Sequence, residues 1–150
     1  MPLQQRHTSR EFSAGGIVYK KKDSEVKWLV VQHSLHKRWI FPKGLIGDNV
    51  DGETKEQTAL REVEEEGGIK ARIALDKPFT TTYFYIFKGT RIFKTVYFYL
   101  MEYVSGDIKD HDFEVSEAKW LTEEEVLETL SFPADKKMFL EAKEFVKEKV

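Results

Sequence analysis

The chain contains no cysteine, only four prolines and no long hydrophobic run. Without cysteine it can form no disulfide, no thiolate nucleophile and no cysteine-ligated zinc site. No apolar stretch approaches the roughly 20 residues that a membrane-spanning helix needs. The polar start MPLQQRHTSR also has no hydrophobic signal region. We therefore expect a cytoplasmic protein that does not interact with membranes.

The chain also lacks an excess of charge of one sign, because 24 Lys and Arg residues nearly balance 26 Asp and Glu residues. A net charge of -2 argues against generic binding along nucleic acid, which needs a basic surface. With 150 residues, 41% of them hydrophobic, the chain has the size and composition of one globular domain. We expect a flexible N-terminus over residues 1–10 and a single domain over residues 11–150. The composition does not indicate an oligomeric state.

The distribution of apolar residues predicts a mixture of strands and helices. Segments rich in β-branched and aromatic residues predict strands over residues 12–19, 28–32, 80–87, 91–101 and 117–121, with a hairpin turn at Lys88 and Gly89. Helical spacing predicts helices over residues 55–66, 122–130 and 134–149. The last helix carries an apolar stripe that we assign to the core and not to a partner interface: Met138, Phe139, Ala142, Phe145 and Val146.

The helix predicted over residues 55–66 has an unusual distribution of charge. Glu62, Glu65 and Glu66 share one face of its last turn, where the helix dipole and mutual repulsion both disfavour carboxylates. A glutamate-rich surface helix is the ordinary explanation of such a run. A divalent cation would remove the conflict, because Mg²⁺ prefers oxygen ligands and binds through a few carboxylates together with water and phosphate.

The spacing of residues around this helix favours the second explanation. It reads Gly47, five residues, Glu53, seven residues, Arg61-Glu62-Val63, one residue, Glu65-Glu66, one residue, and Gly68-Ile69. These residues match every specified position of the Nudix signature, so the chain resembles the Nudix hydrolases. The segments EFSAGGIVYK, WIFPKG and GTRIFKTVYFYLMEY are similar to those of small bacterial and archaeal diadenosine tetraphosphate hydrolases. The resemblance implies an α+β fold, the Nudix-type α/β/α sandwich with a mixed β-sheet.

The resemblance also implies the metal ligands and the catalytic groups. Glu62, Glu65 and Glu66 would bind Mg²⁺, for which Mn²⁺ is a possible substitute, together with a backbone carbonyl. We favour Gly44 of the WIFPKG segment for that carbonyl, although Gly47 is the alternative because three extra residues separate the two glycines. Glu62 is the favoured general base. Its rival, Glu114, comes from the segment FEVSEAKW. Arg61 is expected to pair with Glu53, and the alternative is a solvated arginine.

Candidate substrate contacts lie on both sides of the signature. Lys43 and His36 belong to a basic cluster that could compensate phosphate charge, and Arg91 and Lys94 are further candidates. Tyr85 stands where dinucleoside polyphosphate hydrolases resemble one another in carrying a tyrosine, and it shares a strand face with Tyr83. Such rings stack on a nucleobase, or alternatively pack against aromatic residues of the next strand.

The function implied by the resemblance is hydrolysis of a nucleoside polyphosphate anhydride. Our first expectation is asymmetric cleavage of diadenosine tetraphosphate to ATP and AMP. Removal of pyrophosphate from RNA 5′ ends and hydrolysis of nucleoside triphosphates are alternatives within the same chemistry. A noncatalytic nucleotide-binding Nudix module is an alternative of another class, but such modules commonly lose signature carboxylates and all of them are present here.

Overall fold

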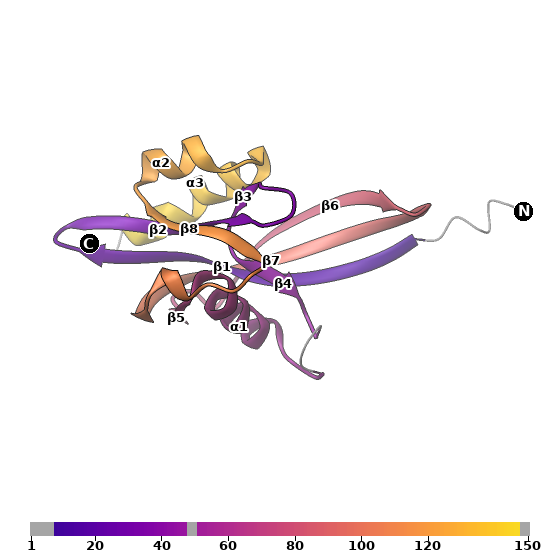
Figure 1. Cartoon of the computed structure of the whole chain (residues 1–150), viewed down its shortest axis with the longest axis horizontal. Coiled ribbons are helices and arrows are strands. Elements are labelled where there is room, and N and C mark those ends of the chain that lie inside the picture. The colour runs from indigo at the N-terminus through magenta and orange to yellow at the C-terminus, as the bar shows by residue number, and fades with distance from the viewer. Residues whose placement is uncertain (1–7, 48–50, 148–150) are drawn as a thin grey trace, which may run out of the picture.

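The computed structural model describes residues 8–47 and 51–147, which form one eight-stranded mixed sheet with helices on both faces (Figure 1). Two long strands, β1 (Thr8–Lys22) and β7 (Thr90–Gly106), run parallel at its centre. β2 (Glu25–His33) pairs with β1 and carries β3 (Trp39–Ile40) and β8 (Val115–Leu121) on either side. All three of these pairings are antiparallel.

The remaining strands pair with the two central ones. β4 (Lys43–Leu45) pairs with β1, whereas β5 (Ile69–Ile73) and β6 (Phe79–Phe87) both pair with β7. Each of these pairings is antiparallel, and β6 joins β7 through Lys88 and Gly89. Both turn residues have positive φ angles, 51° and 79°, as a tight hairpin turn between twisted strands requires.

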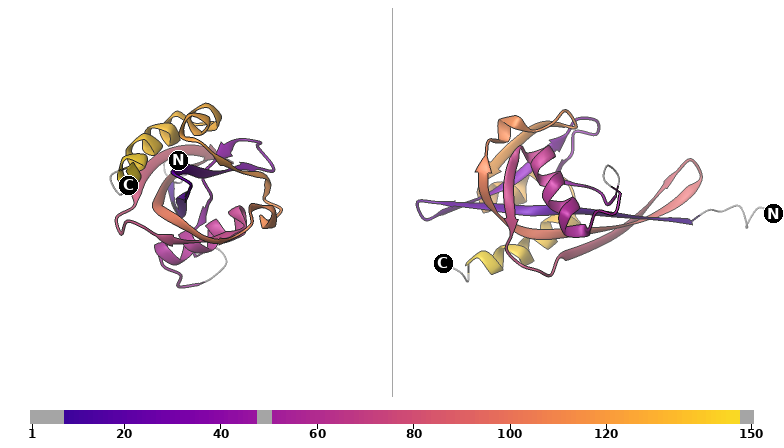
Figure 2. Two further views of the ribbon diagram at one scale, coloured as in Figure 1. Left: turned by 90° about the vertical axis from the view of Figure 1, so that its left-hand side faces the viewer. Right: turned by 90° about the horizontal axis from the view of Figure 1, so that it is seen from below.

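The helices divide between the two faces of the sheet (Figures 1 and 2). α1 (Lys55–Gly67) covers one face, where Val63 packs with Leu29, Tyr99 and Met101. The opposite face is covered by α2 (Glu123–Thr129) and α3 (Pro133–Lys147). A short 3-10 helix, η2 (Ile108–Asp110), follows β7. The arrangement confirms the α/β/α sandwich with a mixed sheet. No helix in the described ranges is long and apolar enough to cross a membrane.

The local signals for α1 act as expected from the sequence. The hydroxyl of Thr54 accepts a hydrogen bond from the Gln57 backbone N–H at 3.1 Å, and the Gln57 side chain accepts from the Thr54 backbone N–H at 2.9 Å. Gly68 closes the helix in the left-handed conformation at φ 75°. These caps leave Glu62, Glu65 and Glu66 in the last turn before a sharp change of direction.

Several boundaries differ from those expected. The strand expected over residues 12–19 begins at Thr8, so residues 8–10 belong to β1 and not to a flexible terminus; residues 1–7 lie outside the described ranges. The helix expected to end at residue 149 is described to Lys147, and residues 148–150 are not described. The short strands β4 and β5 were not expected, because each is too short to show a clear pattern of alternation. β3 lies in the strand-like WIF run of residues 39–41.

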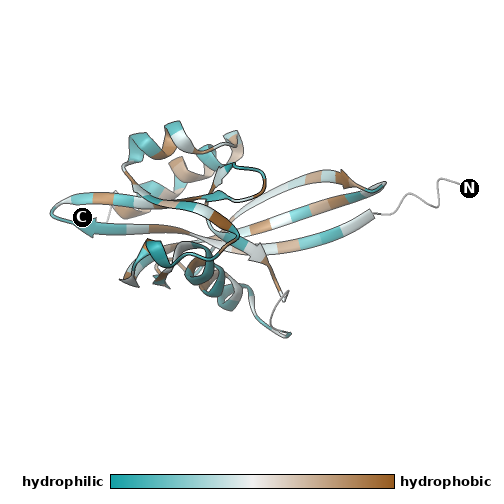
Figure 3. Ribbon diagram, viewed as in Figure 1, coloured by the Kyte–Doolittle hydropathy of each residue, from teal (hydrophilic) through white to brown (hydrophobic). Residues whose placement is uncertain are grey.

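The outer parts of β1, β6 and β7 extend beyond the helices as a three-stranded arm (Figure 1). Apolar and polar residues alternate along it (Figure 3). Opposite residues in paired strands share a face, so Tyr83 and Tyr85 of β6 lie with Lys94 of β7, whereas Phe84 lies on the other face with Phe93. The arm therefore offers different chemistry on its two faces.

Candidate active site

The site begins with the carboxylates of α1, two of which are buried. Glu62 and Glu66 retain only 5% and 4% of their surface exposure, although a glutamate is rarely buried without a partner. Burial raises the pKa of Glu62 to about 7 and the pKa of Glu66 to about 8. Burial disfavours the charged form of a carboxyl group, so both groups resist ionisation in the absence of a cation. A bound cation would lower both pKa values again and favour the ionised carboxylates.

Arg61 connects three of the signature carboxylates. Its guanidinium donates through Nε to Glu53 at 2.8 Å and through Nη2 to the other oxygen of the same carboxylate at 2.9 Å. Nη1 donates to Glu62 at 3.1 Å and to Glu65 at 3.2 Å. The hydroxyl of Thr58 donates to Glu53 at 2.7 Å. The side chain of Arg61 is thus paired and not solvated, and it offsets part of the repulsion expected in the last turn of α1.

Strand β4 brings the backbone of the WIFPKG segment to these carboxylates. The Lys43 backbone N–H donates to Glu66 at 3.1 Å, which fixes that side chain against the strand. Gly44 lies so close to Glu62 that a methyl group on its Cα would overlap the Glu62 carboxylate. A methyl group on Gly47, in contrast, would meet no atom within 4 Å. This contrast favours Gly44 over Gly47 as the source of a ligand carbonyl.

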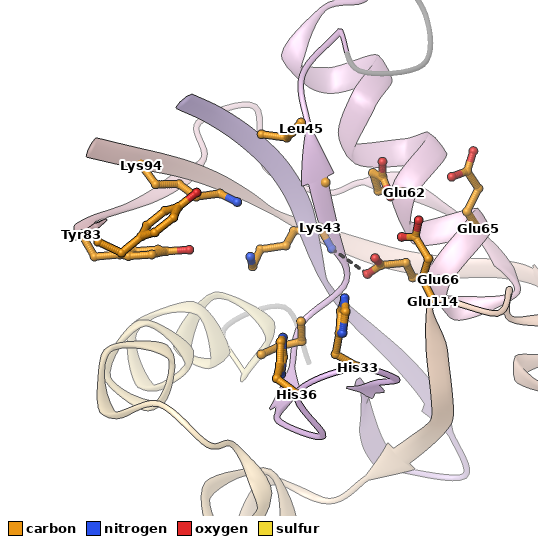
Figure 4. A pocket seen from close by; sticks show the side chains of 13 residues that line it. His33, His36, Lys43, Leu45, Glu62, Glu65, Glu66, Tyr83, Lys94 and Glu114 are labelled. Atoms are coloured by element: carbon orange, nitrogen blue, oxygen red, sulfur yellow. Dashed lines mark hydrogen bonds between the residues drawn. The ribbon is translucent and has the colours of Figure 1, made fainter. Parts of the chain in front are cut away.

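A cavity of about 430 Å³ opens over the carboxylates (Figure 4). Its lining includes ten residues singled out in the sequence: His36, Lys43, Gly44, Glu62, Glu65, Glu66, Tyr83, Tyr85, Lys94 and Glu114. The other lining residues are His33, Ile40 and Leu45. The site thus draws on α1, β2, β3, β4, β6 and β7 as well as two loops.

Three sequence candidates lie outside this lining. Glu53 and Arg61 do not line the cavity. Arg61 joins Glu53 to Glu62 through the hydrogen bonds described above. Arg91 is not brought to the cavity, because its odd spacing from Lys94 on β7 places it on the opposite face of the arm. Its guanidinium lies 5.7 Å from the ring centroid of Phe84. A direct contact between Arg91 and a phosphate chain in this cavity is therefore not supported.

The two lysines of the cavity are partly removed from water. Burial, followed by repulsion from Lys94, lowers the pKa of Lys43 to about 8, although Glu66 and Asp135 oppose the change. Burial also lowers the pKa of Lys94. An anionic ligand would stabilise the charged form of both amines, so the cavity is suited to a group that brings several negative charges.

Glu114 is positioned by two hydrogen bonds of its loop. The Asp112 backbone N–H donates to the carbonyl of Glu65 at 2.8 Å, which fastens the loop to the end of α1. The Asp112 side chain in turn accepts from the Glu114 backbone N–H at 3.1 Å. The loop therefore holds Glu114 beside the helix carboxylates, as the resemblance implied.

The donor set fits a hard divalent cation by its chemistry. Glu62, Glu65 and Glu66 supply carboxylate oxygens, and the close approach of Gly44 to Glu62 leaves room only for backbone at that point. As they stand, no three His, Asp or Glu side chains of the described ranges are gathered closely enough to hold a metal ion. Arg61 holds oxygens of Glu62 and Glu65, so a cation would compete with this guanidinium for the same atoms.

A second cavity of about 450 Å³ adjoins the first and shares His36, Ile40, Lys43 and Tyr83 with it. Its other walls are largely apolar and include Val96, Phe98, Phe132 and Pro133. Asp135 also lines it, and burial raises the pKa of this carboxyl to about 6. Sequence reasoning missed Asp135, although Pro133, as the first residue of α3, marks the helix start beside it. His33 follows directly on the strand predicted over residues 28–32, and nothing else in the sequence marks it as part of the site.

The family model of the NUDIX domain matches residues 9–142. The chain belongs to the Nudix hydrolase family. It is 35% identical over 147 residues to MutT4 of Mycobacterium tuberculosis, covering 93% of this chain and 57% of that protein. It is 34% identical over 126 residues to Nudix hydrolase 6 of Arabidopsis thaliana, covering 79% of this chain and 41% of the relative. The chain thus spans about half the length of these curated relatives.

Solved structures support the same Nudix fold. A C. elegans Ap4A hydrolase binary complex superposes with a TM-score of 0.70 at 24% identity, covering 92% of this chain and 98% of the other. The NUDIX domain of Shewanella oneidensis NrtR complexed with ADP ribose gives a TM-score of 0.61 at 23% identity, covering 92% and 89%. At these identities the likeness extends to the fold alone.

Proposed function

We propose that this Nudix domain hydrolyses a nucleoside polyphosphate anhydride in a metal-dependent reaction, with diadenosine tetraphosphate as the substrate and ATP and AMP as products. The observation that carries the proposal is the pair of adjoining cavities. One is lined by carboxylates and lysines that suit phosphates and cations, and the other is an apolar chamber wide enough for a base. Their shared residues, Lys43 and Tyr83 among them, would contact a ligand that spans both.

The cation would be held by Glu62, Glu65 and Glu66 with the carbonyl of Gly44. A bound Mg²⁺ would supply charge stabilisation at the phosphate oxygens and acidify water. Lys43 and Lys94 would bind and orient the phosphate chain, since both are half-buried, line the cavity and have no ion-pair partner among the described residues. A phosphate chain bound by these groups would exclude bulk water from the bottom of the cavity.

Glu62 is our choice of general base. Glu62 lines the cavity and lies beside Gly44 of β4, so its carboxylate is placed to take a proton from a water at the metal site. Arg61 contacts the same side chain at 3.1 Å and would hold it in place as it changes charge. Glu114 lines the same cavity and is the alternative base.

Two tyrosines support recognition of a second nucleoside. Tyr83 and Tyr85 lie on the cavity face of the arm with ring centroids 6.4 Å apart, and Tyr85 donates to Glu11 at 3.0 Å. An exposed ring in this position can stack on a nucleobase. A dinucleotide would then place one base in the apolar chamber and the other against the arm, with the phosphates between them.

The proposal is tested with a substrate panel incubated with Mg²⁺, whose products are resolved by chromatography. The panel contains diadenosine tetraphosphate, ADP-ribose, nucleoside triphosphates and RNA with a 5′ triphosphate. We expect ATP and AMP from diadenosine tetraphosphate at the highest kcat/KM of the panel. Faster turnover of another substrate would overturn the substrate assignment. If the chain binds these compounds without forming products, it is a noncatalytic module.

A further inference from the structure

Two stacked histidines at the mouth of the first cavity have defined tautomers. His33 ends β2 and His36 follows in the loop to β3, and their ring centroids lie 4.2 Å apart with planes inclined by 14°. The Leu35 backbone N–H donates to Nδ1 of His33 at 3.1 Å, and the Arg38 backbone N–H donates to Nδ1 of His36 at 3.1 Å. A nitrogen that accepts a hydrogen bond carries no proton. Each neutral ring therefore carries its proton on Nε2.

Both rings line the cavity that contains the signature carboxylates. Figure 4 shows them side by side, on the same side of the cavity as Lys43. Within the described part of the chain, neither Nε2 has a hydrogen-bond partner. Burial, together with the positive charges of Lys43 and Arg38, lowers the pKa of His36, which favours the neutral form of this ring.

The loop that carries the two rings is fixed before any ligand binds. The His33 backbone N–H donates to the carbonyl of Arg38 at 3.0 Å, and the Lys37 backbone N–H donates to the carbonyl of His33 at 2.9 Å. Ser34 connects the loop to the loop of Glu114, donating through its backbone N–H to the carbonyl of Glu114 at 2.9 Å. Its hydroxyl also donates to the carbonyl of Phe113 at 2.7 Å. The rings are thus held relative to the catalytic candidate Glu114.

We propose that His33 and His36 form a neutral clamp that donates two Nε2–H hydrogen bonds to oxygens of the substrate's phosphate chain. Two parallel donors with no exposed acceptor suit phosphate oxygens, which only accept, better than a ribose hydroxyl or a base edge, which also donates. The clamp rests on the proposed function, because it identifies further contacts to the same polyphosphate substrate.

The tautomers have a second consequence. With Nδ1 occupied by a backbone N–H and Nε2 already protonated, neither ring has a free lone pair to accept a proton from water in the cavity. Neither ring therefore serves as the general base, which agrees with the choice of a carboxylate for that role. The clamp also adds no charge, so its contribution to binding depends less on salt than that of Lys43 or Lys94.

Paired substitutions distinguish donation at Nε2 from support of the loop. His36→Asn keeps an acceptor near the position of Nδ1 but has no group at Nε2, whereas His36→Gln extends an N–H to about the position of Nε2. Losing a hydrogen bond to a charged group weakens binding by about 1.5–3 kcal/mol, which corresponds to roughly 10- to 150-fold. We expect His36→Asn and His33→Asn to raise KM for diadenosine tetraphosphate by about tenfold or more with little change in kcat. The glutamine variants should restore most of the loss.

The effect of ionic strength provides the control for charge. The ratio of KM between His36→Asn and the wild type should stay constant as salt is raised, whereas the effect of Lys43→Ala should diminish. Equal KM values for the asparagine variants and the wild type would overturn the clamp. An effect of His36→Asn that disappears at high salt would show that the histidine acts through charge, and would also overturn it.

A measurement without turnover separates the clamp from the proposed function. Two-bond ¹H–¹⁵N spectra of the metal-free protein report which ring nitrogen carries the proton, and inorganic tripolyphosphate serves as the probe. We expect protonated Nε2 on both rings and a shift of the Nε2 resonances on titration with tripolyphosphate. Protonated Nδ1, or no shift at saturating probe, would refute the clamp whatever the substrate panel shows. A shift combined with no cleavage of diadenosine tetraphosphate would leave the clamp standing and reject the assigned substrate.

Discussion

Metal binding requires Glu66 to be ionised, whereas burial of this residue in the folded protein favours its protonated form. It is 4% exposed, and burial raises its pKa to about 8. In Glu66→Gln, the amide oxygen can still accept from the Lys43 backbone N–H, but the charge available to a cation is lost. We expect activity to fall by roughly 10²–10⁴-fold, the usual effect of losing one positioned catalytic group. An active Glu66→Gln enzyme would exclude this residue from the metal site.

The stability of the same variant follows from the direction of the pKa shift. A carboxyl whose pKa is raised by folding stabilises the protein at low pH, and that contribution is lost as pH rises through about 8. Glutamine stays neutral throughout. In chelator, thermal melts should therefore show the variant about as stable as the wild type near pH 4, below the unfolded carboxyl pKa of 4.5, and progressively more stable than the wild type as pH rises toward 9. A variant that is less stable at pH 9 would contradict burial of an ionised Glu66.

Tyr85 allows base stacking to be separated from packing within the sheet. Its side chain is 37% exposed on the cavity face, whereas its neighbour Phe84 is 57% exposed on the opposite face of β6. Tyr85→Ala should raise KM for diadenosine tetraphosphate by the equivalent of about 1–3 kcal/mol with little change in kcat. Phe84→Ala is the matched control and should leave KM unchanged. Steady-state kinetics test both, and similar KM values for the two variants would reject stacking on Tyr85.

At the scale of the element, α1 depends on the guanidinium that joins its carboxylates. The Arg61 side chain is 17% exposed. Its contacts to Glu53, Glu62 and Glu65 use several N–H groups of one planar guanidinium, which the single ammonium group of lysine cannot replace. We expect Arg61→Lys to lower the free energy of unfolding by about 1–3 kcal/mol in urea denaturation without metal. Arg72→Lys is the control, because Arg72 pairs with Glu102 at a side-chain exposure of 70% and such surface pairs contribute little to stability. Equal losses in the free energy of unfolding for the two variants would show that the contacts of Arg61 stabilise the protein no more than a surface ion pair does.

The sequence predicts α1 well because its signals are local. Thr54 with Gln57 and the glycine at 68 define the two ends, and the spacing of the signature identifies the buried carboxylates. β4 and β5 have no comparable signal, since their three and five residues become strands through pairing with distant parts of β1 and β7. Packing with residues far along the chain, and not local propensity, decides these elements.

At the scale of the whole molecule, the sequence predicts most of the residues that line the first cavity, but not the arrangement of all of them. Lys43, Lys94 and Tyr83 come from different strands and converge on the cavity as expected. Arg91 does not, and the two-residue period of a strand could have separated it from Lys94. Asp135 reaches the second cavity only through the way α3 packs on the sheet. Such a position depends on tertiary structure and leaves no trace in a local pattern.

Metal binding should be coupled to proton release from the whole protein. Glu62 and Glu66, with pKa values of about 7 and about 8, hold protons near neutral pH, and a cation can bind only their ionised forms. We expect Mg²⁺ binding to release about one to two protons near pH 6.5 and close to none near pH 9. The affinity should rise over the same range. Calorimetry in buffers of different ionisation enthalpy measures this release.

The Glu66→Gln variant provides the control for this experiment, because it removes the group with the higher pKa. It should release about one proton fewer than the wild type near pH 6.5. Arg61→Lys should bind Mg²⁺ with the same proton release, since Arg61 remains charged at every pH of the experiment. Binding of Mg²⁺ without proton release near pH 6.5 would show that the cation does not bind Glu62 and Glu66, and would move the metal site away from the buried face of α1.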